Sequence, residues 1–340
     1  MQHWALDLDQ NNIAWLCFDK LESSANVLSA DVLKEFAMII EHLELNLPAG
    51  LVIYSGKKNG FIMGADINEF TMIHDVDEAY KLIRQGQQVL DALENLNCPT
   101  VAVINGYALG GGLELAMACN YRLAYENDKP IIGLPEVQLG LHPGFGGTVR
   151  AVRLTGVRAA MKLMLTGKPI RVSSAYKNRL IDRLCNSEEW QNQARELIKT
   201  QPTPSSAPLL EEILNLGIFR GFIAKTLIKQ VKSKAKQAHY PAPYAMIKIW
   251  KEHGASLKTG YKAEARSMAE LMCGSTSRNL IRVFFLQNKL KAQLPRSDSP
   301  IKNIHVIGAG IMGGDIASWC ALRGFNVTLQ DRSLEDITPA

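Results

Sequence analysis

The stretch that decides the fold runs from residue 104 to residue 150 and reads INGYALGGGLELAMACNYRLAYENDKPIIGLPEVQLGLHPGFGGTVR. Three successive glycines, Gly110 to Gly112, follow a strand-like apolar segment and open a predicted helix. Glycine lets the backbone approach a ligand closely, and the first turn of a helix presents N–H groups with a partial positive charge. The segment therefore predicts a place where backbone N–H groups bind a negatively charged oxygen atom.

Two glutamates in this stretch have apolar neighbours. Glu114 lies among leucines, and Glu136 lies between Pro135 and Val137. Glutamate is rarely buried without a reason. Each observation also has a plain explanation, because a triple glycine can be a flexible turn and a helical glutamate can belong to a solvated face. If both carboxylates lie near free N–H groups, they suit acid–base chemistry that passes through an enolate.

Four motifs follow one another here: Asn105-Gly106, Ala108 to Glu114, Leu134-Pro135-Glu136, and Gly140 to Gly147. In this order they closely resemble the enoyl-CoA hydratase/isomerase (crotonase) family. The resemblance implies an α/β chain with the ClpP/crotonase-like fold of repeated ββα units and a helical region after it. It also implies that Glu114 and Glu136 are the catalytic residues.

The segment from residue 61 to residue 67, FIMGADI, resembles the first oxyanion and CoA-binding segment of the same family. The resemblance implies that the backbone N–H groups of Met63 and Gly111 form the oxyanion hole. It implies CoA contacts for Gly64, Ala65 and Asp66. Without the resemblance, Met63 would be interpreted as a core methionine.

Composition limits the possible functions. The 340 residues are 47% apolar and 21% charged, as in an ordinary soluble enzyme of about two domains. There is no apolar run of about 18 residues and no signal segment at the start, so we expect a cytoplasmic protein without a membrane span. The six scattered cysteines favour free thiols over disulfides or a metal site. A net charge of +5 suits a polyanionic cofactor such as coenzyme A, but it is too small to indicate nucleic acid.

Strands and helices alternate in the first half of the chain. Period-two patterns predict paired strands, and longer periodic segments predict helices, one of them with Ser29 as its N-cap. The predicted strands are 5–8, 13–18, 50–55 and 100–104, and the predicted helices are 29–45 and 76–95. This alternation indicates crossover connections and a largely parallel sheet.

Two positions in the next segment depart from the family pattern. Residues 155–182 are predicted to be helical, but Arg179 stands where relatives carry glycine, which puts the local turn in doubt. His142 replaces the usual aliphatic residue before Pro143, and we assign it no catalytic role.

The helical region follows a linker. Residues 201–206 read QPTPSS, which is typical of a linker, and 209–294 are predicted to be mostly helical, with one long helix over 276–294. Its lysines predict a solvated surface, and a phosphate-binding or membrane-binding face is the alternative. They are Lys225, Lys229, Lys232, Lys234 and Lys236.

A dinucleotide-binding fingerprint, G-x-G-x-x-G, occupies Gly308 to Gly313 between a strand-like and a helix-like segment. The glycines allow a tight turn and close approach to a pyrophosphate, and Asp331, after a second predicted strand over 326–330, can bind the ribose hydroxyls. The segment resembles the NAD-binding start of 3-hydroxyacyl-CoA dehydrogenases. The candidate NAD-binding residues are Gly308, Gly310, Met312, Gly313 and Asp331.

These observations predict three parts: a hydratase/isomerase core over 1–200, a helical region with a linker helix over 201–295, and the start of a Rossmann domain over 301–340. The chain resembles the amino-terminal portion of the alpha subunits of fatty-acid oxidation complexes, so we expect it to stop inside its second domain. The resemblance implies hydration of trans-2-enoyl-CoA in β-oxidation together with Δ3-Δ2-enoyl-CoA isomerisation. It implies NAD-dependent oxidation of 3-hydroxyacyl-CoA by the full-length protein only.

The same resemblance implies a 3-ketoacyl-CoA thiolase partner in a hetero-oligomeric complex, and the fragment could also form a homo-oligomer. One alternative is an isomerase without hydration, which the presence of both Glu114 and Glu136 disfavours. The other is a non-catalytic scaffold that docks a thiolase or a membrane.

Overall fold

Apolar segments that alternate with helices build a six-stranded sheet in the order β1-β2-β3-β5-β7-β10. The computed structural model describes residues 1–58, 60–293 and 301–338. Strand β1 pairs with β2 in an antiparallel hairpin, and the other neighbours are parallel, as predicted. The strands are β1 (Trp4–Leu8), β2 (Ile13–Phe18), β3 (Gly50–Ser55), β5 (Thr100–Ile104), β7 (Tyr121–Tyr125) and β10 (Arg183–Cys185).

A smaller four-stranded sheet positions the motifs identified in the sequence. Its order is β4 (Gly60–Ile62), β6 (Tyr107–Leu109), β8 (Pro130–Gly133) and β9 (Ile170–Arg171). The first three strands are parallel, so their carboxyl ends meet at one edge. Directly after these ends come Met63, the triple glycine and the Leu134-Pro135-Glu136 motif, respectively. The topology therefore brings three segments that are far apart in sequence to one place.

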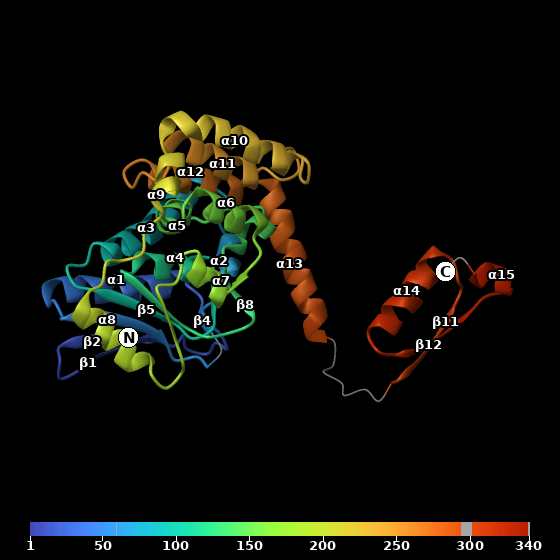
Figure 1. Cartoon of the computed structure of the whole chain (residues 1–340), viewed down its shortest axis with the longest axis horizontal. Helices are drawn as coiled ribbons and strands as arrows, with labels where there is room; N and C mark the ends of the chain where they lie inside the picture. Colours follow the sequence, from blue (N-terminus) through green and yellow to red (C-terminus); the bar gives the residue numbers. More distant parts are fainter. Residues whose placement is uncertain (59, 294–300, 339–340) are drawn as a thin grey trace. The chain divides into compact units, whose positions relative to one another are not determined.

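Helices cover the sheets (Figure 1). Helix α4 is buried along its whole length, because its residues are glycine or apolar apart from Glu114. Both long helices predicted for the first hundred residues are present, and Ser29 is the N-cap residue of α1 as predicted, although its hydroxyl donates to Asp31 and makes no capping hydrogen bond. The helices are α1 (Ala30–Leu45), α2 (Ile67–Phe70), α3 (Val76–Glu94), α4 (Gly111–Ala118), the 3-10 helix η1 (Pro135–Leu139), α5 (Gly147–Thr155), α6 (Val157–Thr166), α7 (Val172–Lys177) and α8 (Trp190–Thr200).

The prediction of continuous helix over 155–182 is wrong. Gly167, with φ 59°, ends α6, and the chain forms β9 before α7 begins. After α7, Arg179 takes the left-handed conformation with φ 61°, and its N–H donates to the Tyr176 carbonyl at 2.9 Å. The chain thus makes a left-handed turn at an arginine, at a cost of about 1–2 kcal/mol.

The helical region is confirmed and consists of α9 (Leu209–Leu214), α10 (Gly217–Lys232), α11 (Ala242–His253), α12 (Gly260–Met272) and α13 (Ser275–Gln293). Helix α12 packs against α3 and α5, and α11 packs against α12. One compact unit, Met1–Phe285, contains both sheets and most of this region. In the part of the chain that the structure describes, no helix is long and apolar enough to cross a membrane.

A second unit comprises Leu286–Ala340. It contains β11 (Asn303–Ile307), α14 (Ile311–Leu322), β12 (Asn326–Gln330) and α15 (Leu334–Ile337). Strands β11 and β12 are parallel and α14 connects them, which is the β-α-β unit that the fingerprint predicts. The predicted bounds of the three parts of the chain stay predictions.

Candidate active site

Each glycine of the triple glycine is required by its surroundings. Gly110 has φ 51° and ψ −127°, a conformation open to glycine. A methyl group on Gly112 would lie 2.4 Å from the carbonyl oxygen of Ile62. A methyl group on Gly111 would point toward the side chains of Leu28 and Phe145, at 3.3 Å from each. The absence of side chains here allows α4 to begin directly against β4.

The prediction that the Met63 N–H is an oxyanion donor is wrong. This N–H donates to the Asn26 carbonyl at 2.8 Å, so it is not available to a ligand. Two residues later, the Ala65 N–H has no acceptor within the described ranges, and a methyl group on Gly111 would lie 3.5 Å from the Ala65 nitrogen. The Gly111 N–H, at the first position of α4, likewise has no acceptor among the described residues. Two free N–H groups therefore lie close together, one of them from an unexpected residue.

Glu114 is buried, with 2% of its surface exposed. Its Oε1 accepts from the N–H groups of Phe145 and Gly147, at 2.8 and 2.7 Å. Burial, followed by the nearby Glu136 and Glu264 carboxylates, raises the pKa of Glu114 well above its usual range. Because one carboxylate oxygen is held by two amides, the side chain has a fixed position.

Glu136 lies on η1, and one of its oxygens faces the triple glycine: a methyl group on Gly110 would be 3.0 Å from its Oε1. Its Oε2 is buried and has no hydrogen-bond partner in the part of the chain that the structure describes. Burial raises the pKa of Glu136 to about 8, with a smaller contribution from Glu264. This carboxyl group is well suited to be protonated near neutral pH.

A third buried carboxylate, Glu264 on α12, was not predicted. It is fully buried, and its pKa is raised by burial. It shares the buried face of α12 with Tyr261, Ala265 and Met268. A charged residue on the apolar side of an amphipathic helix is the sequence signal that could have identified it.

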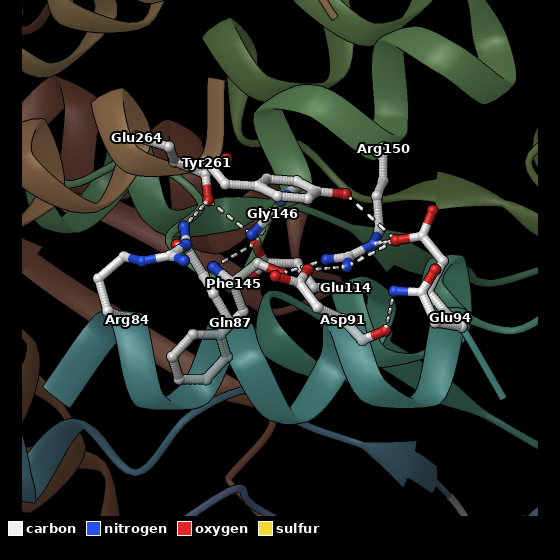
Figure 2. A network of polar contacts seen from close by, with 12 residues as sticks. Arg84, Gln87, Asp91, Glu94, Glu114, Phe145, Gly146, Arg150, Tyr261 and Glu264 are labelled. Carbon is white, nitrogen blue, oxygen red and sulfur yellow. Dashed lines mark hydrogen bonds and ion pairs between the residues drawn. The ribbon is translucent and has the colours of Figure 1, made fainter. Parts of the chain in front are cut away.

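The turn from Phe145 to Thr148 joins these carboxylates (Figure 2). Glu264 accepts from the Gly146 N–H at 2.5 Å and from the Thr148 N–H at 2.8 Å. The Phe145 carbonyl accepts from Arg150 Nη1 at 2.6 Å. Arg150 in turn forms ion pairs with two acidic side chains of α3 and lies over the Tyr261 ring. The turn is thus held by charged groups from α4, α5 and α12.

An apolar cavity of about 800 Å³ lies next to this region. Leu28 and Phe145, which contact the open side of Gly111, are part of its lining. Most of the remaining lining comes from α1, α2, the segment between α2 and α3, and α3, with Met272 from α12, and it includes Leu33, Ile40, Phe70, Ile73, Ile83 and Val89. The cavity can hold a long apolar group close to the start of α4.

The fingerprint of the second unit has the geometry that the sequence predicts. Gly308 has φ 102°, and a methyl group on Gly313 would lie 1.8 Å from the Gly308 carbonyl oxygen. Asp331 accepts from the Ala309 N–H at 2.6 Å, so it also fixes the loop. These backbone positions fit a dinucleotide pyrophosphate.

The family model "Enoyl-CoA hydratase/isomerase" matches residues 9–241. The chain belongs to this family. The model "3-hydroxyacyl-CoA dehydrogenase, NAD binding domain" matches residues 303–340, so the order of the two matches is that of a fused hydratase and dehydrogenase.

Solved structures agree on the crotonase fold of the first unit. An enoyl-CoA hydratase from Bacillus anthracis is 25% identical, with a TM-score of 0.54, and the match covers 86% of this chain and 97% of that one. Human mitochondrial delta3-delta2-enoyl-CoA isomerase is 21% identical, with a TM-score of 0.62 and coverage of 85% and 99%. Pseudomonas aeruginosa DspI is 26% identical, with a TM-score of 0.54 and coverage of 71% and 86%.

Gly64, Ala65 and Asp66, the predicted CoA-binding residues, lie in the loop between β4 and α2. Gly64 has φ 110°, and its carbonyl accepts from Leu28, which fixes the loop that carries Ala65. Asp66 caps α2 through the Asn68 N–H at 3.0 Å. A CoA contact of these residues stays a prediction. No group of three or more metal-binding side chains occurs within residues 1–58, 60–293 and 301–338.

His142 is fully buried and lies outside the proposed chemistry. Its Nδ1 lies 2.7 Å from the Pro143 carbonyl and its Nε2 lies 2.9 Å from the Ser267 hydroxyl. A carbonyl only accepts, so Nδ1 carries the proton and Nε2 accepts from Ser267. Burial lowers the pKa of His142 to about 4, which keeps the ring neutral.

Proposed function

We propose that this chain adds water to trans-2-enoyl-CoA thioesters and forms 3-hydroxyacyl-CoA. One observation carries the proposal: the buried Glu114 and the partly buried Glu136, whose Oε2 is shielded from solvent, flank the start of α4, where the Ala65 and Gly111 N–H groups have no acceptor among the described residues. Acid, base and oxyanion donors are the groups that hydration of a conjugated thioester requires. The apolar cavity beside Gly111 suits the acyl chain.

In the proposed reaction, ionised Glu114 removes a proton from water as the water oxygen forms a bond to C3. The electrons of the C2–C3 double bond move toward the thioester carbonyl, and the enolate oxygen is held by the Ala65 and Gly111 N–H groups. When the enolate collapses, C2 takes a proton from Glu136. The net result is addition of H and OH across the double bond. After the product leaves, Glu114 loses its proton to solvent and Glu136 takes one up from solvent, which restores the starting state.

Hydrogen bonding supports this division of roles. Glu114 accepts two amide N–H groups, which stabilise its ionised form, whereas Oε2 of Glu136 has no donor among the described residues. When the two carboxyl groups share one proton, Glu136 therefore holds it more readily. Each oxyanion N–H contributes about 3–4 kcal/mol to such reactions, and general acid–base catalysis contributes about 10²–10⁴-fold.

The test is the loss of the conjugated enoyl-CoA absorbance, measured with wild type, Glu114→Gln and Glu136→Gln. Both substitutions keep the side-chain volume but remove the proton transfer, so we expect hydration to fall by at least about 10²-fold in each. Melting temperatures near or above the wild-type value would show that the fold is intact. Near wild-type turnover in either variant would refute the two-glutamate mechanism.

Isomerisation between Δ3- and Δ2-enoyl-CoA needs a single group that moves a proton between C2 and C4. Glu136 is our candidate, because its Oε2 has no donor among the described residues, whereas two amide N–H groups stabilise ionised Glu114. Glu136→Gln should then abolish isomerisation, whereas Glu114→Gln should retain part of it. Equal loss in both variants would contradict this assignment.

We extend the proposal to the full-length protein. Gly308, Gly310, Met312, Gly313 and Asp331 would hold NAD, which accepts a hydride when bound, and the narrow loop at Gly308 and Gly313 fits its pyrophosphate. A thiolase partner, which rests on the family resemblance, and a cytoplasmic location are parts of the same proposal. Native mass measurement with a thiolase added would test the partner.

A further inference from the structure

Glu264 is a buried charged group that the proposed mechanism does not use. It comes from α12 in the helical region, far in sequence from the glutamates at the triple glycine. Its Oε1 accepts from Gly146 N and Gln87 Nε2, and its Oε2 accepts from the N–H and the hydroxyl of Thr148. Four donors are thus directed at one carboxylate, which is as many as its lone pairs can accept.

The amides of the turn alternate between two carboxylates. Glu114 accepts from Phe145 and Gly147, and Glu264 accepts from Gly146 and Thr148. Figure 2 shows Phe145 and Gly146 between the two side chains. The turn therefore cannot move with respect to Glu264 without also moving the two amides that hold Glu114.

We propose that Glu264 is a positioning residue for enoyl-CoA hydration, which fixes the Phe145–Thr148 turn and through it the Oε1 atom of Glu114. The inference rests on the proposed function of Glu114. It implies that the helical region is part of the active-site architecture, because α12 supplies the group that completes the turn.

A carboxylate is needed at this position rather than any polar side chain. Glutamine offers one oxygen, so its NH₂ group would face the Thr148 N–H, where donor would meet donor. The negative charge also acts on the two glutamates, since Glu264 contributes to the raised pKa of Glu114 and of Glu136. Other charged or titratable groups around Glu264 and this turn include Arg84, Asp91 and Glu94 on α3, His142 before the turn, Arg150 on α5 and Tyr261 on α12.

The experiment compares Glu264→Gln with Glu270→Gln by hydration kinetics over a range of pH. Glu270 is an exposed residue of the same helix that pairs with Arg266, so its variant is a matched control. A misplaced catalytic group can cost about 10²-fold in rate, so we expect Glu264→Gln to lower kcat by about 10–100-fold. KM should change by less than about twofold, because Glu264 does not touch the substrate. Glu270→Gln should match wild type.

The pH profile separates positioning from mere stability. Removing the charge of Glu264 lowers the pKa of Glu136, so the fall in rate on the alkaline side should move to lower pH in Glu264→Gln. A purely structural role of Glu264 would lower the melting temperature but leave the alkaline fall in rate at the same pH as in wild type. Unchanged kcat per folded molecule, or an alkaline fall at an unchanged pH, would overturn the proposal.

Two further measurements keep the proposal testable. If Glu264→Gln does not fold, Thr148→Val is tested in its place, because it removes only the hydroxyl that donates to Glu264. The kcat of this variant should fall by about threefold, which corresponds roughly to the free energy of one hydrogen bond. An unchanged kcat would overturn the inference. If wild type does not hydrate enoyl-CoA, the proposed function has failed. Infrared titration of the Glu114 carboxyl, identified with Glu114→Gln, then decides: a downward shift in Glu264→Gln supports the coupling, and no shift refutes it.

Discussion

At the scale of single residues, the proposed proton donor Glu136 is a carboxyl group whose pKa is raised by burial. The pKa of Glu136 is raised to about 8, above its value in the unfolded chain. A group of this kind stabilises the fold fully below the unfolded pKa, near 4 to 5, and this stabilisation is lost as pH rises through about 8. We therefore expect the melting temperature of wild type to fall between pH 6 and pH 9.

Glu136→Gln should reduce this pH dependence, because glutamine does not ionise in that range. Since each kcal/mol corresponds to about 2–4 °C for a domain of this size, the variant should be several degrees more stable than wild type at pH 9. Differential scanning calorimetry at pH 6 and pH 9 measures both effects. A variant whose melting temperature falls as steeply with pH as that of wild type would show that other groups are responsible.

Arg150 is a second residue whose replacement should be costly. Its guanidinium is 2% exposed and pairs with Asp91 and Glu94, while Nη1 holds the Phe145 carbonyl. Arg150→Met would remove the ion pair of Asp91 and leave Glu94 paired with Arg153, and we expect a loss of about 3 kcal/mol in the free energy of unfolding. Chemical denaturation measures it, and Arg153→Met, at a half-exposed neighbour, is the control. Equal losses would contradict the buried network.

The sequence showed some of these residues and not others. Glu114 and Glu136 could be predicted because each lies in a local motif. Ala65 could not be chosen over Met63, since the availability of an N–H depends on pairing with Asn26 and Leu28, which lie in a separate segment. Glu264 was missed because its partners, Gly146 and Thr148, are brought to it only by packing of α12 on α5.

At the scale of secondary structure elements, the site depends on close contact between β4 and the start of α4. Gly112→Ala would place a methyl group 2.4 Å from the Ile62 carbonyl, which must push β4 and the oxyanion segment away. We expect a loss of about 1–3 kcal/mol in the free energy of unfolding, and lower hydration activity. Denaturant unfolding together with the absorbance assay measures both.

Gly221→Ala is the matched control for this prediction. Gly221 lies inside α10, and no atom lies within 4 Å of the position that a methyl group would take. Alanine should therefore stabilise the chain by about 0.5–1 kcal/mol, as expected for a glycine in a helix interior. If both substitutions had the same effect, contact between β4 and α4 would not be the reason.

Elements with strong local periodicity were predicted well. The strands β2, β3 and β5 and the helix α3 have close to the expected bounds. The structure of segment 155–182 was predicted wrongly. The helical periodicity of its sequence does not show that Gly167 ends α6 or that β9 pairs with β8. Arg179 shows the converse, since its turn is imposed by the surrounding chain rather than favoured by its own side chain.

At the scale of the whole molecule, the two units differ in completeness of their sites. The first contains carboxyl groups, free N–H groups and an apolar cavity within residues 1–285. The second contains one β-α-β unit, whose apolar side chains are largely exposed: Ile307, Ile311, Trp319 and Leu322 are 59–91% exposed. A doubly wound site binds its dinucleotide between two such halves.

We therefore expect the 340-residue chain to hydrate enoyl-CoA without reducing NAD when given 3-hydroxyacyl-CoA. The loop from Gly308 to Gly313 can bind a pyrophosphate, but hydride transfer also requires a positioned substrate and a proton acceptor. Purified chain is assayed for NADH formation, and hydration in the same sample is the control for folding. NAD binding without NADH formation agrees with the expectation. Gly313→Ala should weaken this binding, because its methyl group would lie 1.8 Å from the Gly308 carbonyl oxygen. Steady NADH formation would show that these residues complete a dehydrogenase site.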